Sequence, residues 1–126
     1  MRLDRRNEAI TAYRQALVID DTYELAWSNL GNAYLLDGYF GQARRAYEKV
    51  LELRPGYTDA LHGLGNVALQ EGAHQEALDF YRAVLQSDTS YVSAHYGMAM
   101  AYRGLGDSVR AVTELRAFKK KQIAQR

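Results

Sequence analysis

The stretch GLGNVA, residues 63–68, fits the loose pattern G-x-G-x-x-A with which some proteins bind dinucleotides. In that chemistry the glycines let backbone amides approach a pyrophosphate, so the pattern must follow a strand and open a helix. Here the pattern falls inside a segment with helical periodicity, and an internal repeat described below accounts for Gly65. The sequence therefore predicts no nucleotide and no other cofactor.

Histidine is the next residue type that could do chemistry, and the chain has His62, His74 and His95. A zinc site on a helix would use two histidines four residues apart, as in H-E-x-x-H, and these three have no such spacing. The chain also has no cysteine to complete a ligand set. His95 lies on an apolar helical stripe, so we expect a core or half-core residue. The sequence predicts no metal site.

Carboxylates could act as general acids or bases if two of them met in an apolar pocket. Glu48, Glu52 and Glu71 are candidates by type, but acids occur throughout helical surfaces and no apolar cluster surrounds a pair of them. We therefore predict no catalytic residue, and the chain is expected not to be an enzyme.

A basic run, KKK at residues 119–121, could face an anionic partner or a lipid surface. Only Phe118 and Ile123 are large and apolar nearby, and no aromatic residues interleave with the lysines. We favour a solvated helix end over a binding site. The lysines of that end would also form the polar terminal surface that a stacked array needs for solubility.

Composition narrows the class of protein further. The 126 residues carry a net charge of +1, which gives no electrostatic reason to expect nucleic acid. No apolar run is long enough to span a membrane, and the charged start lacks the apolar core of a signal peptide. The absence of cysteine suits a reducing cytoplasm, taken as the default, but equally a disulfide-free exported protein, so the compartment stays open.

The secondary structure that positions these residues is indicated first by the run WSNLGNAY, residues 27–34. Its Trp27, Leu30, Gly31 and Tyr34 share one stripe of a helix. Glycine within a helix costs about 1 kcal/mol relative to alanine, so Gly31 predicts a close approach. Four sets of residues recur every 34 positions: Tyr13, Tyr47 and Tyr81; Tyr23, Tyr57 and Tyr91; Ala9, Ala43, Ala77 and Ala111; Gly38, Gly72 and Gly106. A fixed period of this length indicates a stacked array of supersecondary units.

Each unit reads as two helices. In the first complete unit the stripes cover residues 24 to about 37 and 40 to 53, with Gly38 where a helix would end in the left-handed conformation. Pro55 prevents the second helix from continuing. Sustained alternation of apolar and polar residues, typical of strands, is missing. The sequence therefore predicts an all-α fold.

These residues resemble the tetratricopeptide repeat family, whose unit reads W-x2-L-G-x2-Y, then A-x3-F, then P. The resemblance divides a single domain, 1–126, into a half repeat at 4–23 and repeats at 24–57, 58–91 and 92–125. It implies about seven helices in a right-handed superhelical stack of antiparallel pairs. It also implies that paired helices cross most closely where Gly31, Gly65 and Ala99 meet Ala43, Ala77 and Ala111. The third repeat matches the family pattern more weakly than the first two.

The half repeat lacks its first helix, so Tyr13 should lose about half of the burial that its counterparts have. This leaves two hypotheses open. The chain is a fragment of a longer protein, or a second copy covers the open N-terminal helix edge and the protein is a homo-oligomer.

The family's first helices line a concave groove that holds a peptide or a partner helix. By register this groove would contain Ser28, Asn29, Asn32, Leu36, Asp59, His62, Asn66, Gln70, Tyr96, Met100 and Arg103. The amides of Asn32 and Asn66 could bind a peptide backbone. Tyr96 and Met100 could form an apolar pocket, and Gly63 and Gly97 would leave room beside it.

The function expected from the resemblance is a non-catalytic protein–protein interaction module or an assembly scaffold. Two alternatives stay open: a self-associating structural element, or the recruitment arm of a larger enzyme. One well-known family mode, a clamp of lysines, an arginine and asparagines that captures acidic chaperone tails, is not expected, because only Asn32 matches it.

Overall fold

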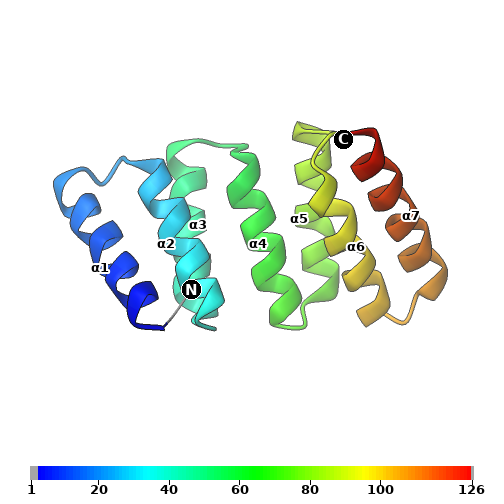
Figure 1. Ribbon diagram of the computed structural model, residues 1–126, viewed down its shortest axis with the longest axis horizontal. Helices are drawn as coiled ribbons and strands as arrows, with labels where there is room; N and C mark the ends of the chain where they lie inside the picture. Colours follow the sequence, from blue (N-terminus) through cyan, green and yellow to red (C-terminus); the bar gives the residue numbers. More distant parts are fainter. Residues whose placement is uncertain (1–2, 126) are drawn as a thin grey trace. The chain divides into compact units, whose positions relative to one another are not determined.

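The computed structural model describes residues 3–125, and these residues form seven α-helices and no strand. The helices follow one another in chain order (Figure 1): α1 Leu3–Ile19, α2 Glu24–Leu36, α3 Phe40–Leu53, α4 Thr58–Gln70, α5 His74–Ser87, α6 Val92–Gly104 and α7 Ser108–Ala124. The predicted all-α fold is confirmed. None of the helices in the described part combines the length and the apolar character that crossing a bilayer requires.

The chain divides into two compact units, of which the first ends at Gly63 and the second begins at Leu64. In the first unit α1 packs against α2 and α2 against α3; in the second α5 packs against α6 and α6 against α7 (Figure 1). The helix α4 contributes its first residues to one unit and the rest to the other. The division into one domain with repeats at 24–57, 58–91 and 92–125 stays a prediction.

The first helix of each pair ends at a glycine, as the sequence predicts. Gly38 has a φ of 80°, a left-handed conformation that a side chain would strain. The N–H of Tyr39 donates to the carbonyl of Tyr34 at 2.9 Å, and that of Gly38 to Leu35 at 3.1 Å. This pair of bonds satisfies the last carbonyls of α2 and turns the chain sharply into α3. Gly72 and Gly106 have the same φ within a few degrees.

Side-chain caps contribute little at the starts of these helices. The residues before α2, α3, α5 and α6 make no capping hydrogen bond through their side chains, whereas Asp107 accepts one from the N–H of Arg110 before α7. Helices of this length are marginal on their own in water, so packing must stabilise them.

A buried tyrosine forms the centre of the first unit. Tyr47 of α3 is 0% exposed, and its ring lies against two glycines. A Cβ added at Gly31 of α2 would lie 2.7 Å from Tyr47 Cε1, and one added at Gly63 of α4 would lie 2.4 Å from Tyr47 Cζ. The Tyr47 hydroxyl donates to Asn32 Oδ1 at 2.5 Å. We call this arrangement the tyrosine clamp.

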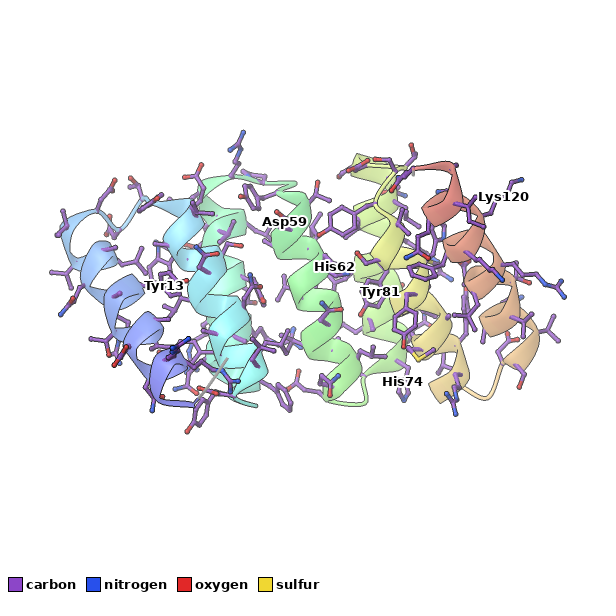
Figure 2. The ribbon with its side chains drawn as sticks, in the orientation of Figure 1. Tyr13, Asp59, His62, His74, Tyr81 and Lys120 are labelled. Atoms are coloured by element: carbon purple, nitrogen blue, oxygen red, sulfur yellow. The ribbon has the colours of Figure 1, made fainter. Side chains whose placement is uncertain are left out.

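The second unit repeats the tyrosine clamp 34 residues later. Tyr81 of α5 is 0% exposed and lies in the interior of this unit (Figure 2). A Cβ added at Gly65 would lie 2.7 Å from its ring, and one added at Gly97 would lie 2.4 Å from it. The Tyr81 hydroxyl donates to Asn66 Oδ1 at 2.7 Å.

The tyrosine clamp corrects one expectation and adds to another. A Cβ added at Gly31 or Gly65 would meet a tyrosine ring first. The implied close crossing of these glycines with Ala43 and Ala77 stays a prediction. The expectation that Gly63 and Gly97 leave room for a partner was wrong, because both are buried and both admit a tyrosine ring. One glycine of each clamp was recognised from the sequence as a close approach, and the other, Gly63 or Gly97, was expected to lie beside open space.

The half repeat shows the expected loss of burial. Tyr13 of α1 is only half-buried, and it packs beside the cluster of Leu17, Ala26 and Leu30 (Figure 2). Arg6 of α1 forms an ion pair with Asp37, whose side chain is 4% exposed, so α1 is also tied to the end of α2.

The C-terminal lysines do not all face solvent. Lys119 and Lys120 are exposed, and Lys120 extends away from α7 in Figure 2. Lys121 instead donates to the carbonyl of Thr89 at 2.7 Å and to His95 Nε2 at 2.8 Å. On its other side His95 bonds Glu114 through Nδ1 at 2.7 Å, and the histidine is 9% exposed. His95 is thus a core residue, as expected, and Lys121 is part of its environment.

We predict that Gly63→Ala destabilises the chain, because the new methyl group must displace the Tyr47 ring. Overpacking typically costs about 1–3 kcal/mol, of which the higher helix propensity of alanine recovers up to about 1 kcal/mol. The matched control is Gly41→Ala in α3, where an added Cβ meets nothing within 4 Å and should stabilise. Urea unfolding of both variants measures the difference. Equal midpoints would contradict the clamp.

The turn before α6 predicts an acid-sensitive contribution to stability. The Ser90 hydroxyl donates to Asp88 Oδ1 at 2.6 Å and the Ser90 N–H at 2.9 Å, and these bonds lower the pKa of Asp88 below its ordinary 3.8. A lowered pKa stabilises the folded chain above pH 3.8, and this contribution is lost as pH falls through the lowered value.

We therefore expect Asp88→Asn to lose less stability than the wild type between about pH 4 and pH 2, while being the less stable of the two at neutral pH. Unfolding in urea across that range measures the effect. Glu48→Gln, at an exposed carboxylate, should follow the wild-type curve, and a parallel curve for Asp88→Asn would disprove the assignment.

Candidate protein-binding surface

The predicted groove residues of α2 are Ser28, Asn29, Asn32 and Leu36, and the structure places them at different depths. Leu36 is 67% exposed, Asn32 is exposed and Asn29 is half-buried. Ser28 differs from the prediction, since it is 5% exposed and cannot offer its hydroxyl to a ligand. The remaining three lie three and four residues apart, on one face of the helix.

The predicted residues of α4 are Asp59, His62, Asn66 and Gln70, which also fall on one stripe of that helix. Asp59 and Gln70 are exposed, and His62 and Asn66 are half-buried. Figure 2 shows Asp59 and His62 on the first turns of α4, within the first unit.

The predicted residues of α6 combine an aromatic, an apolar and a basic side chain. Tyr96, Met100 and Arg103 lie at i, i+4 and i+7, so they share one face within the second unit. Tyr96 is 48% exposed, Arg103 is exposed and Met100 is half-buried. The Tyr96 ring leans on Phe118 of α7, with ring centroids 5.6 Å apart and planes at 54°. We call Tyr96, Met100 and Arg103 the α6 patch.

The two predicted asparagines have a structural task that sequence reasoning missed. Asn32 and Asn66 accept the hydroxyls of the clamp tyrosines, so their Oδ1 atoms already have a partner. Burial raises the pKa of Tyr47 and of Tyr81, which keeps both hydroxyls protonated as donors. The sequence did contain a signal, because each asparagine precedes its tyrosine by 15 residues in both repeats.

Phe118 was also missed as a supporting residue, since the sequence indicated only a large apolar side chain near the lysines. Among residues 3–125, no three histidine, aspartate or glutamate side chains gather in a group that could share a metal ion.

The family model for the protein kinase G tetratricopeptide repeat matches residues 5–122. The chain belongs to this family. The resemblance seen in the sequence is thereby confirmed over nearly the whole chain, and a tetratricopeptide repeat fold implies protein partners.

Solved structures agree with this assignment. The chain is similar to a crystal structure of MamA, with a TM-score of 0.85 and 26% identity over 95% of this chain and 70% of that one. A second MamA crystal structure gives a TM-score of 0.82 and 26% identity, over 93% and 64%. MamA residues 41-end from Desulfovibrio magneticus RS-1 give 0.86, over 98% and 70%; at 15% identity this match shows the fold alone. A search of curated protein sequences finds no match.

We predict that the clamp asparagine Asn32 and its neighbour Asn29 on α2 respond differently to truncation. Asn32→Ala leaves the Tyr47 hydroxyl without its acceptor, which should cost about 1–3 kcal/mol of unfolding free energy. Asn29→Ala removes an amide that bonds no described residue and should stay within about 0.5 kcal/mol of the wild type. Thermal and urea unfolding of the two variants test this difference. An unchanged Asn32→Ala protein would contradict the structural role.

Proposed function

We propose that this chain is a non-catalytic protein-interaction module, acting alone or as an assembly scaffold, that binds a peptide or a partner helix. The binding faces would be the exposed stripes of α2, α4 and α6. Membership in a tetratricopeptide repeat family supports this class of function, and the α6 patch is the observation that carries the proposal for the site.

The α6 patch combines the side chains that dominate protein interfaces. Tyrosine and arginine are enriched among residues whose truncation weakens binding most, and methionine adapts to irregular apolar partners. Contact with Phe118 restricts the Tyr96 ring before any partner arrives, so less side-chain entropy is lost on binding. Arg103 would add a bidentate donor for a carboxylate at the end of the stripe.

On α2 the tyrosine clamp fixes the amide that a partner would meet. Because the Tyr47 hydroxyl donates to Asn32 Oδ1, the NH2 group of Asn32 remains as a donor that bonds no described residue. An oriented donor on an exposed helix face suits the backbone carbonyl of an extended peptide. Leu36, one turn along, offers an apolar contact beside it.

A second candidate follows from the matching family's description, which names a protein kinase. In that case the chain would serve as the recruitment arm of a larger enzyme, and its partner would be a substrate or a regulator. A third candidate is self-association through α1, whose Val18 and Ile19 are each 87% exposed. The complete reading frame distinguishes the second candidate from the first.

We predict that Tyr96→Ala weakens peptide binding by about tenfold or more, equivalent to about 1.4 kcal/mol, because it removes the aromatic anchor of the patch. Peptides selected from a displayed random library against the wild type supply the ligands, and fluorescence anisotropy measures their affinities. Tyr23→Ala is the matched control, since Tyr23 is 46% exposed and lies outside the patch.

Peptides that bind both variants equally would place the binding face elsewhere. Sedimentation of the Ile19→Lys variant across a concentration series tests self-association in parallel. A mass lower than that of the wild type would favour the third candidate over the first.

A further inference from the structure

A cavity of about 420 Å³ lies among α1, α2 and α3 in the first unit, away from the predicted groove residues. Its walls are apolar and come from all three helices: Leu17, Trp27, Leu30, Tyr34 and Ala46 line it. Pockets that bind ligands usually have volumes of about 300–1,000 Å³ with walls of this kind. The cavity is therefore large enough to admit at least one large apolar side chain.

One of the residues that line this space is small. Ala46 of α3 occupies the position that holds Glu114 two repeat periods later, in the second unit. There the longer side chain reaches across to His95, the residue that corresponds to Trp27. In the second unit a hydrogen bond joins Glu114 to His95. In the first unit the corresponding residues, Ala46 and Trp27, make no such bond, and both line the cavity.

The mouth of the cavity is basic. Arg14 of α1 and Arg45 of α3 stand at its rim, and neither makes an ion pair or hydrogen bond with any described residue. The counterpart of Arg14 in the second unit, Arg82, is engaged: it donates to the Tyr102 hydroxyl at 3.0 Å and pairs with Asp79. Two arginines held beside an apolar space without a partner favour a ligand that brings carboxylates of its own.

Acidic groups at the rim do not neutralise these arginines. Asp21 is the one carboxylate among the residues that line the cavity, and Gln42 is uncharged. The backbone carbonyl of Asp21 accepts a hydrogen bond from Trp27 Nε1 at 2.7 Å, which satisfies the polar atom of the indole. The rim thus carries a net positive charge over an apolar wall whose polar atom is already bonded.

We propose that this cavity binds a second segment of a partner protein, one in which a large apolar side chain is flanked by acidic residues. The apolar side chain would enter between Leu17 and Ala46, and the carboxylates would pair with Arg14 and Arg45. This inference rests on the proposed function as a protein-interaction module, and it adds a site with its own chemistry, separate from the α6 patch.

Trp27 supplies the measurement, because it is the single tryptophan of the chain and it lines the cavity. The probe is a short peptide in which Phe-Leu is flanked on both sides by paired glutamates. One control peptide replaces the glutamates by lysines, and the other replaces Phe-Leu by alanines. We expect the acidic apolar peptide to shift Trp27 emission saturably, with an affinity at least about tenfold above either control and weakening as salt rises.

Two variants test the site itself. Ala46→Phe fills the cavity, and the repeat register supports its fit because Phe80 occupies the corresponding position one period later. Arg14→Glu with Arg45→Glu reverses the rim charge at two exposed, unpaired side chains, so the fold should be retained. Each change should weaken the acidic peptide by about tenfold or more. The doubly reversed variant should now prefer the lysine peptide.

The outcomes separate this proposal from the proposed function. Tyr96→Ala should leave the cavity peptide unaffected, and Ala46→Phe should leave ligands of the α6 patch unaffected. The cavity proposal is overturned if the glutamate and lysine peptides bind alike or if both cavity variants retain binding. It is also overturned if decanoate alone titrates Trp27, or if Trp27 emission and sedimenting mass change together with protein concentration, which would indicate a second copy. Failure to find any ligand of the wild type that Tyr96→Ala weakens would contradict the proposed function and leave the cavity result standing.

Discussion

The tyrosine clamp is the constraint on which the described helices depend. One ring from a second helix lies against a glycine of its own repeat and a glycine of the following first helix, as Tyr47 does with Gly31 and Gly63. Its position fixes both spacings at once, because a Cβ on either glycine would collide with the ring. Each glycine costs helix stability of about 1 kcal/mol relative to alanine, and burial of a tyrosine side chain offsets that cost. The buried hydroxyl needs an acceptor, which Asn32 provides.

The sequence predicted what depends on local physics and repetition. The helix limits of the first complete unit and the left-handed Gly38 follow from patterns within a few turns of chain, and the 34-residue period follows from repetition along the sequence. The neighbour that fills the space above a glycine could not be predicted in the same way. Periodicity shows which face of α4 carries Gly63, but a tyrosine 16 residues upstream decides whether that face is open or closed. For the same reason Asn32 and Asn66 were predicted to offer their amides to a peptide, while their bonds to tyrosine were missed.

The two units share the tyrosine clamp and differ beside it. At one register the first unit has Trp27 and Ala46 around an open apolar cavity, while the second has His95 and Glu114 joined by a hydrogen bond and extended by Lys121. A polar network must be fully satisfied to be tolerated in a core, and here both ring nitrogens of the histidine have partners. The two units thus keep the same clamp contacts while the residues beside the clamp differ.

The difference between clamp residues and their neighbours limits which side chains can contact a partner. A side chain that holds a clamp tyrosine cannot also turn toward a ligand without leaving a buried hydroxyl unsatisfied, which would cost about 1–3 kcal/mol. In the proposed function, most partner contacts therefore come from residues outside the clamps, such as Tyr96, Met100 and Arg103, whose replacement should leave the core intact, while Asn32 contributes only its NH2 group. Because these residues stand on helices held by the clamps, binding at the proposed site would require little ordering, and the entropy retained would contribute to affinity.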